Sequence, residues 1–251
     1  MGLSLILNPV SSVRYFEFDF VKKNLGGNPN GLTILDVSSP YLFGIYTAIN
    51  YPASKYLYVN ADVAEIRNLH KLTRLIGLAA PTYQAMEGNA VKLSYSEGYF
   101  DAVISISVIE HVDGVDDGKA MAEMWRVLKV GGTLNLTFMV AKNYEEEFRK
   151  ESQYNLPVAQ TGGEYFFQRF YDKESVQRRL LDAIDNFEII DQKIWGEKEN
   201  GFFKAYEKRW MNNGLSETVK DPAYMHQYFD AYEDFDGLQG IGIMCIALRK
   251  R

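Results

Sequence analysis

The clearest pattern in the chain is a strand, a helix and a second strand between residues 100 and 140. Residues 102–106 form a nearly continuous apolar run rich in β-branched side chains, which predicts a strand covered on both faces. Residues 119–129 repeat apolar positions at helical spacing, with Asp116 expected as the cap and Gly131 as a left-handed stop. A second buried strand follows over 133–140. This order predicts a right-handed crossover between parallel strands, the unit of an open α/β sheet.

The same periodicities predict further elements on both sides of this unit. Upstream, strands are expected over 32–37, 55–60 and 82–87, and helices over 11–25, 41–51 and 63–76. Ser11 or Ser12 would cap the first helix. Downstream, a helix is expected from residue 171 to about 185, and strands over 187–195 and 240–248.

Two long segments do not fit this alternation. Residues 141–170 are polar and aromatic, contain Pro157 and a glycine pair, and read as a long loop of the kind that forms functional lids. Residues 196–238 carry many aromatic side chains at helical intervals, which predicts two short helices. We expect these two insertions to form an aromatic cap. Its apolar face would roof an acceptor pocket, form a homodimer contact, or simply pack on the sheet.

Composition narrows the class of protein. The 251 residues are 47% hydrophobic and 24% charged, which fits a single domain over 1–251 with enlarged loops. The formal charge of −6, without a basic stripe, argues against a nucleic-acid partner. The single cysteine, Cys245, lies in an apolar run and predicts a buried thiol and a cytoplasmic protein. No apolar run reaches the roughly 20 residues that span a bilayer, so we expect no membrane partner.

The central unit resembles a known enzyme family. Residues 100–112 read Phe-Asp-x-Val-x-Ser-x-x-Val-Ile-Glu-His-Val, and the helix that follows ends in Trp-Arg-Val-Leu-Lys-x-Gly-Gly. This combination is similar to the second half of class I methyltransferases that depend on S-adenosylmethionine (SAM). The resemblance implies a doubly wound, seven-stranded, mostly parallel sheet, with the last strand antiparallel beside the sixth. It also implies SAM as the cofactor.

The first turn departs from the pattern of that family. The family usually carries an acidic residue and then three alternating glycines, so that backbone N–H groups can approach the methionine end of SAM. Asp36 is present here, but Ser38, Pro40 and Leu42 occupy the three glycine positions. The resemblance implies that the methionine end is held by a turn made of four residues, which are Asp36, Val37, Ser38 and Ser39.

The resemblance also assigns residues to the nucleoside. Asp62, after the second strand, would accept hydrogen bonds from the ribose hydroxyls, cap the helix that follows, or do both. Asn89 and Ala90 stand where the family contacts adenine, and Ser105 and Ile106 would line the pocket at the end of the fourth strand. Arg14 and Tyr15 belong to a cluster that closes over the cofactor in similar proteins; the alternative is a first helix that only packs on the sheet.

Glu110-His111 is the candidate for catalysis. His111 would take a proton from an acceptor hydroxyl, because the ordinary pKa of histidine lies close to physiological pH. In similar methyltransferases a further glutamate three residues upstream helps to bind a divalent metal. Ser107 occupies that position here, so no metal site is expected.

The sequence therefore predicts methyl transfer from SAM to a small molecule or to a sugar of a glycan. Two alternatives remain at this point. One is a noncatalytic binding module that keeps the fold but has lost the glycine turn. The other is a nicotinamide-dependent oxidoreductase, although the chain lacks the Gly-x-Gly-x-x-Gly motif of those enzymes.

Overall fold

The structure, a computed structural model, describes residues 13–78, 80–152, 160–213 and 227–251. Its strands and helices alternate along the first half of the chain, as the periodicity predicts. The elements up to the central crossover are α2 (Val13–Asn24), β1 (Thr33–Val37), α3 (Tyr41–Asn50), β2 (Lys55–Asn60), α4 (Val63–Leu75), β3 (Tyr83–Glu87), β4 (Phe100–Ile106), the 3-10 turn η1 (Ile109–His111), α5 (Asp116–Val127) and β5 (Leu128–Ala141).

The second half of the chain adds shorter elements. They are β6 (Glu145–Arg149), β7 (Gln160–Thr161), β8 (Glu164–Phe170), α6 (Lys173–Ser175), the short turns η2 (Val176–Leu180) and η3 (Leu181–Ala183), β9 (Phe187–Glu197), α7 (Phe202–Asn213), β10 (Phe229–Tyr232) and β11 (Ile241–Lys250). The expected helix after residue 171 is thus a succession of three short helical segments.

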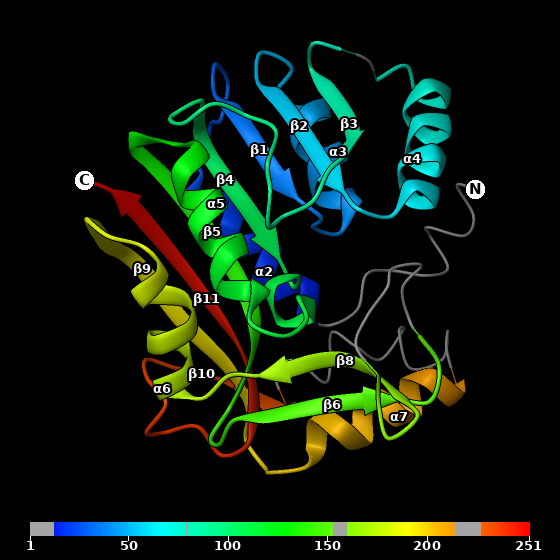
Figure 1. The fold of residues 1–251 in the computed structure, drawn as a ribbon, viewed down its shortest axis with the longest axis vertical. Helices are drawn as coiled ribbons and strands as arrows, with labels where there is room; N and C mark the ends of the chain where they lie inside the picture. Colours follow the sequence, from blue (N-terminus) through cyan, green and yellow to red (C-terminus); the bar gives the residue numbers. More distant parts are fainter. Residues whose placement is uncertain (1–12, 79, 153–159, 214–226) are drawn as a thin grey trace.

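The main sheet has the order β10-β9-β11-β5-β4-β1-β2-β3 (Figure 1). β1, β2, β3, β4 and β5 pair in parallel, and β11 is antiparallel to both β5 and β9. The mostly parallel sheet and its antiparallel last strand are therefore confirmed. The count of seven strands is one short, because β10 adds an eighth strand antiparallel to β9.

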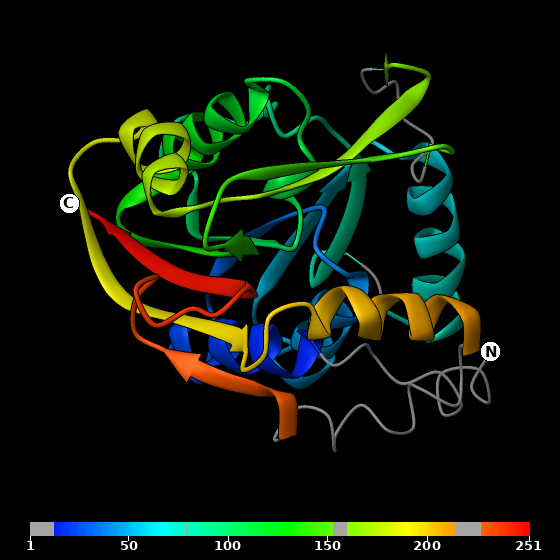
Figure 2. The same cartoon turned by 90° about the horizontal axis from the view of Figure 1, so that it is seen from below.

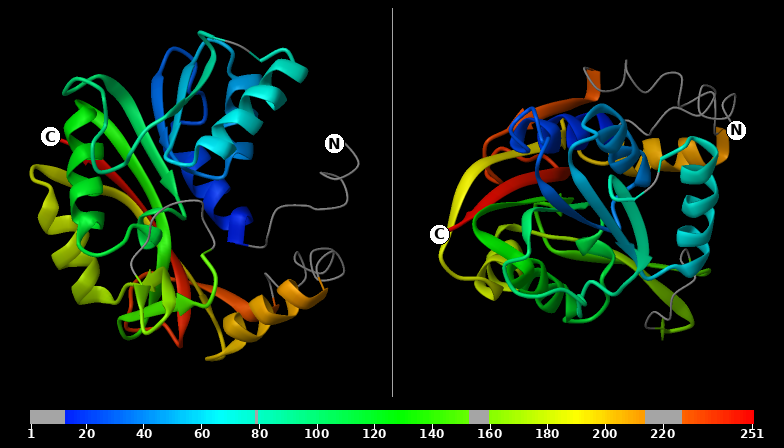
Figure 3. Two further views of the ribbon diagram at one scale, coloured as in Figure 1. Left: turned by 45° about the vertical axis from the view of Figure 1, so that its right-hand side comes forward. Right: turned by 90° about the horizontal axis from the view of Figure 1, so that it is seen from above.

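Helices cover the sheet on both faces. Successive strand residues point to opposite sides, so Ile34 packs in the core with α2, α3 and α4, and Leu35 packs in the core with α5 and the 173–183 segment. Figure 3 shows these two groups of helices on opposite sides of the sheet. Both faces of the central strands are therefore buried, which explains their continuous apolar runs.

The central helix begins and ends differently from the prediction. Asp116 is the first residue of α5, and Val115 before it makes no side-chain capping hydrogen bond. The helix ends at Val127 and the chain passes directly into β5. Gly131 does take a left-handed φ of 83°, but it lies inside the strand rather than at the end of the helix.

The interpretation of 141–170 as a loop is wrong for the part that the structure describes. β6, β8 and β7 form a separate antiparallel sheet, with register pairs such as Glu147 and Gln168. Charged side chains occupy both strands of this pair, so the apolar alternation that signals a strand is weak. Pro157 lies outside the described residues. In Figure 1 the parallel strands point toward this cap sheet.

The second insertion, 196–238, is part helix and part strand. α7 confirms the first expected helix, whereas Phe229 and Tyr232 belong to β10. Residues 214–226, with Tyr224, lie outside the described part. Phe202 stacks on Tyr228 with ring centroids 4.1 Å apart, and Phe229 packs in the core against Phe16 of α2. Figure 2 shows β10, in orange, beside α2, in dark blue. These aromatic side chains thus pack within the molecule.

Cys245 is fully buried in β11, as expected, and burial raises the pKa of its thiol. Among the described residues, no helix is long and apolar enough to cross a membrane.

Candidate functional site

A cavity of about 350 Å³ opens at the carboxyl ends of the parallel strands, where open α/β sheets bind ligands. Its volume falls within the range of small-molecule sites, roughly 300–1,000 Å³. The lining comes from the ends of β1, β2, β3 and β4, from the first turn of α4, and from the segment between β4 and the start of α5. It consists of Ser38, Asn60, Ala61, Asp62, Glu65, Gly88, Asn89, Ala90, Val91, Ser107, Val108, His111, Val112, Asp113 and Asp116.

The charged side chains that line this cavity are all acidic. Its lining includes the carboxylates of Asp62, Glu65, Asp113 and Asp116, and it includes no lysine or arginine. Carboxylates at short range favour a positively charged ligand and disfavour an anion. The cavity is therefore suited to a cation or to a ligand rich in hydroxyl donors.

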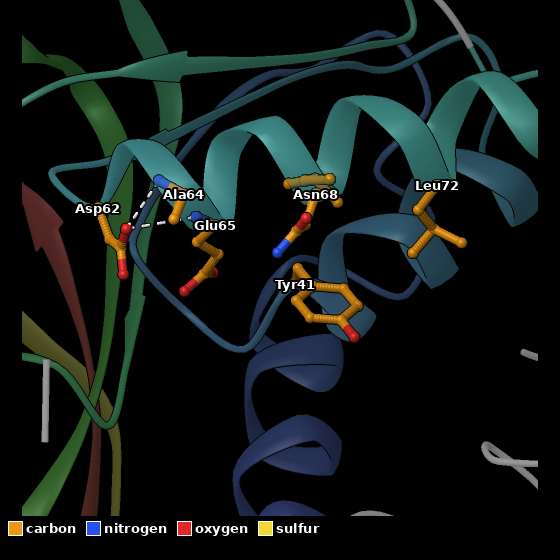
Figure 4. Close-up of a pocket in the computed structure, with 7 residues that line it drawn as sticks. Tyr41, Asp62, Ala64, Glu65, Asn68 and Leu72 are labelled. Carbon is orange, nitrogen blue, oxygen red and sulfur yellow. Dashed lines mark hydrogen bonds between the residues drawn. The ribbon is translucent and has the colours of Figure 1, made fainter. Parts of the chain in front are cut away.

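Asp62 has the capping role that was one of its two expected functions. Its Oδ1 accepts hydrogen bonds from the backbone N–H groups of Ala64 (2.8 Å) and Glu65 (3.3 Å), which begin α4 (Figure 4). The same side chain lines the cavity, so the cap also fixes its carboxylate at the cavity wall. Capping and ribose binding are compatible in this geometry.

Glu65 is a site residue that the sequence reasoning missed. Its Oε1 accepts a 2.5 Å hydrogen bond from the hydroxyl of Tyr58, and the amide of Asn60 donates to the same hydroxyl at 3.0 Å. Glu65 and Asp62 line both the main cavity and a second one of about 330 Å³ between α3 and α4 (Figure 4). Its position three residues after Asp62, on the first turn of a helix, was the available signal.

The first turn keeps the shape of a glycine turn without the glycines. Ser38 has a φ of 59°, in the left-handed region that glycine favours, and it lines the cavity. Its backbone N–H and its hydroxyl both donate to the carbonyl of Val59. Neither Pro40 nor Leu42 is among the residues that line the cavity. The substitutions in this turn therefore leave the cavity open.

Asp36 lies beneath this turn and not in the cavity. It is fully buried, accepts a 2.5 Å hydrogen bond from the hydroxyl of Tyr56 and a 3.0 Å bond from the N–H of Ser39, and burial raises its pKa to about 6. Val37 and Ser39 are also buried in the sheet and the turn. The expected ligands Asp36, Val37 and Ser39 therefore shape the turn from below, and Ser38 alone of the four lines the cavity.

Ser105 and Ile106 likewise lie below the cavity. The hydroxyl of Ser105 donates to the carbonyl of Val37 (3.3 Å), and the N–H of Ile106 donates to the hydroxyl of Ser39 (2.9 Å). These bonds join β4 to the first turn. The cavity is lined instead by the next two residues, Ser107 and Val108, and Ser107 has a left-handed φ of 50°.

Asn89 and Ala90 both line the cavity, as expected. The side-chain oxygen of Asn89 accepts a 3.0 Å hydrogen bond from the N–H of Val91 and closes a tight turn. That oxygen already has one partner, so contact with an adenine amino group would use its second lone pair.

His111 lines the cavity and is held by the cap sheet. Its Nδ1 lies 2.7 Å from the carbonyl oxygen of Phe167 in β8. A carbonyl only accepts, so Nδ1 carries the proton and Nε2 carries the basic lone pair. Burial lowers the pKa of His111 to about 4, and Arg14, Arg149 and Arg169 nearby add to this effect. The ring is therefore neutral at physiological pH.

Glu110 is fully buried and neither of its carboxylate oxygens has a hydrogen-bond partner among the described residues. Burial, together with the nearby Glu17, raises its pKa to about 8, so it is protonated at neutral pH. Its neighbour Glu17, in α2, is well paired: Arg14, Ser107 and Thr137 donate to its carboxylate at 2.5, 2.5 and 2.6 Å.

Arg14 therefore acts within this buried cluster, and neither Arg14 nor Tyr15 lines the main cavity. Tyr15 is 42% exposed and lines a separate hollow against β9. The structure thus brings together Ser38, Asp62, Asn89, Ala90 and His111, and it leaves the other expected site residues outside the cavity. The described part of the chain holds no cluster of three or more histidine, cysteine, aspartate or glutamate side chains suited to a metal ion.

Comparison with known proteins agrees with this fold. Residues 44–136, which contain most of the cavity lining, match the family model of the methyltransferase domain. A geranyl diphosphate C-methyltransferase from Streptomyces coelicolor A3(2), solved with S-adenosyl-L-homocysteine, superposes with a TM-score of 0.59 and 13% identity, over 94% of this chain and 80% of its own. Residues 44–136 thus match a methyltransferase domain, and the chain as a whole shares the fold of this solved methyltransferase.

Other proteins that are similar to this chain have different activities. A cyclase structure superposes with a TM-score of 0.57 and 18% identity, over 93% of this chain and 79% of its own. A curated relative, the tRNA (carboxymethyluridine(34)-5-O)-methyltransferase of Arabidopsis thaliana, is 29% identical over 133 residues, which are 53% of this chain. The match covers 30% of that relative, so the chain spans about a third of its length.

Proposed function

We propose that this chain transfers the methyl group of SAM to an oxygen or nitrogen of a small molecule, with sugars of glycans inside that class. The observation that carries the proposal is the acidic cavity at the carboxyl edge of a methyltransferase sheet. SAM bears a sulfonium and an ammonium group against a single carboxylate, so its net charge is positive, and four carboxylates with no basic side chain suit that charge. SAM, when bound, supplies an electrophilic methyl group.

Different residues of the cavity would bind different parts of SAM. Asp62, and beside it Glu65, would accept hydrogen bonds from the ribose hydroxyls. Asn89 and Ala90 would contact the adenine, and Ser38 would border the methionine end. The protein then has to hold an acceptor atom in line with the methyl carbon, near 3 Å, and exclude water. The cap sheet over His111 supports that second role.

His111 is the candidate base. Its neutral ring has the basic lone pair on Nε2, so it can take a proton from an acceptor hydroxyl as the oxygen attacks. Burial lowers its pKa to about 4, so the ring is neutral and able to accept a proton at physiological pH, but it is a weaker base than an ordinary histidine.

A nucleic-acid acceptor, as for the Arabidopsis relative, has less support. The charge of the chain is −6 and no basic side chain lines the cavity. Phosphate backbones need lysine and arginine contacts for affinity.

The noncatalytic binding module is the second candidate, and the serine turn favours it. Calorimetry and thermal unfolding with SAM, with S-adenosylhomocysteine (SAH) and with NAD separate the two. We expect SAM and SAH to raise the melting temperature, since a ligand at 100 times its Kd stabilises by about 2.7 kcal/mol, and NAD to have no effect. Transfer of labelled methyl from SAM to a panel of phenols, amines and sugars then tests turnover. Absence of any shift with SAM and SAH would overturn the proposal.

A further inference from the structure

Arg169, in β8, is a charged side chain that is fully buried. Its Nη1 lies 3.1 Å from the carboxylate of Asp117, which Arg179 also binds at 2.7 Å. The rings of Phe166 and Tyr171 lie 4.9 and 5.9 Å from the guanidinium carbon. Burying such a charge is costly even when it is paired, and an apolar residue would fill the same space at lower cost. Packing alone therefore does not explain an arginine here.

The guanidinium contacts a backbone segment that borders the cavity. Nη1 donates to the carbonyl of Val112 at 2.6 Å, and Nη2 donates to the carbonyl of Gly114 at 3.1 Å. The segment between η1 and α5 is irregular, and Gly114 has a φ of 60°. Val112 and Asp113 from this segment line the cavity.

β8 holds the other end of the same segment. The carbonyl of Phe167, two residues before Arg169, binds Nδ1 of His111 at 2.7 Å. One strand of the cap sheet therefore fixes the segment 111–114 at both ends. The segment 111–114 is irregular and only partly buried, and Arg169 donates to two of its carbonyls. The carbonyl of Val112 receives its hydrogen bond from Arg169, whereas that of Gly114 also accepts one from Arg179.

We propose that Arg169 is a positioning residue that sets the wall 111–114 of the cofactor cavity and couples the cap sheet to cofactor binding. The part of this inference that concerns cofactor binding rests on the proposed function, which names SAM as the ligand of the cavity. The coupling is reciprocal by thermodynamic linkage, so a cofactor that binds this wall also steadies β8.

The test compares Arg169→Lys and Arg169→Met with Arg178→Met, a change at an exposed arginine on the neighbouring helical segment. Lysine keeps the charge beside Asp117 but cannot donate to both carbonyls in the same geometry. We expect both Arg169 variants to bind SAH about tenfold more weakly by calorimetry, which is the loss of one hydrogen bond to a charged group. Arg178→Met should bind as the parent does.

A second measurement does not depend on the cofactor. Hydrogen exchange of the backbone amides of 111–114, without ligand, should become faster in Arg169→Lys than in the parent and in Arg178→Met. Unchanged exchange would overturn the positioning role. Faster exchange with unchanged SAH affinity would overturn the coupling. If the parent itself binds neither SAM nor SAH, the proposed function fails, and the exchange data alone still decide whether Arg169 sets the wall.

Discussion

At the scale of single residues, the site mixes polar groups that are fully paired with a few that burial perturbs. Asp62 is held by its helix, Glu65 by a tyrosine hydroxyl, and His111 by a backbone carbonyl. Glu110 has no such partner and is neutral instead. For Glu110, which lies outside the cavity lining, burial and not the residue type alone decides that the carboxyl group is neutral.

Asp62 allows its two roles to be separated. Asp62→Ala removes both the cap and the carboxylate, whereas Asp62→Ser keeps a capping oxygen. We expect both variants to bind SAH at least about tenfold more weakly, because each loses the charged acceptor for ribose. Only the alanine variant should lose helix stability, by about 1 kcal/mol. Calorimetry and urea unfolding check the two effects; a serine variant that binds as the parent does would remove Asp62 from the ribose site.

His111→Asn tests the base. The asparagine amide can still donate to the carbonyl of Phe167 but provides no basic nitrogen at the position of Nε2. We expect kcat to fall about a hundredfold while SAM affinity stays close to that of the parent. Steady-state kinetics with an active acceptor measure kcat, and calorimetry measures the affinity for SAM. Equal kcat values in the two proteins would assign His111 a packing role.

Glu110 makes stability depend on pH. Its pKa is raised from 4.5 to about 8, so the folded state holds a proton that the unfolded chain has lost, and stability falls as pH rises through this range. His111, with its pKa lowered from 6.5 to about 4, acts in the opposite sense, but only below pH 6.5. Asp36 acts like Glu110, but only up to about pH 6.

Between pH 6.5 and 8, the change of the free energy of unfolding with pH should therefore come mainly from Glu110. At about 1.4 kcal/mol per pH unit, the parent should lose roughly 2 kcal/mol over this range, and Glu110→Gln, which resembles the protonated acid, should lose little. Urea unfolding at the two pH values measures the difference. Glu174→Gln, at an exposed position, is the control and should keep the slope of the parent.

At the scale of elements, the buried carboxylate of Glu17 joins α2 to the sheet through hydrogen bonds. Glu17 accepts from the hydroxyls of Ser107 and Thr137, at the ends of β4 and within β5, and pairs with Arg14 on its own helix. The helix thereby fixes Ser107, a strained residue of the cavity wall. α2 thus supports the cavity wall from behind.

Glu17→Ala should be strongly destabilising, by about 3–5 kcal/mol, because it leaves a partly buried arginine and two hydroxyls without the carboxylate to which they donate. Asp19→Ala, on the exposed side of the same helix, should change stability by less than about 0.5 kcal/mol. Urea unfolding compares the two variants. A loss for Glu17→Ala no larger than for Asp19→Ala would show that α2 is held by its apolar contacts alone.

At the scale of the whole molecule, the charge of −6 and the acidic cavity predict no affinity for nucleic acid. In a gel-shift assay with bulk tRNA at low salt, where phosphate contacts are strongest, we expect no complex at micromolar protein. A complex that weakens steeply as salt is added would instead favour an acceptor like that of the Arabidopsis relative. The homodimer stays a prediction, and a measurement of the molecular mass of the protein in solution tests it.

The sequence by itself determined the alternation of strands and helices, and with the resemblance it carries it identified five of the residues that line the cavity: Ser38, Asp62, Asn89, Ala90 and His111. The apolar run 102–106 and the cap at Asp62 are local signals that the fold keeps. Gly131, expected as the stop of the central helix, shows that not every local signal is kept, because it lies inside β5. The resemblance over 100–132 then indicated the edge of the sheet where Asp62, Asn89, Ala90 and His111 meet.

Only the tertiary structure decided which polar side chains face that cavity. Ser105 and Ser107 differ by two positions, yet the first binds a strand carbonyl and the second lines the cavity, because the chain turns between them. The sequence did not predict the cap sheet, because its strands lack an alternating apolar pattern. Their polar side chains pair across the two strands, as Gln168 does with Glu147. The pairing of Glu17 with Ser107 and of Arg169 with Val112 joins residues 90 and 57 positions apart, and such contacts have no sequence period.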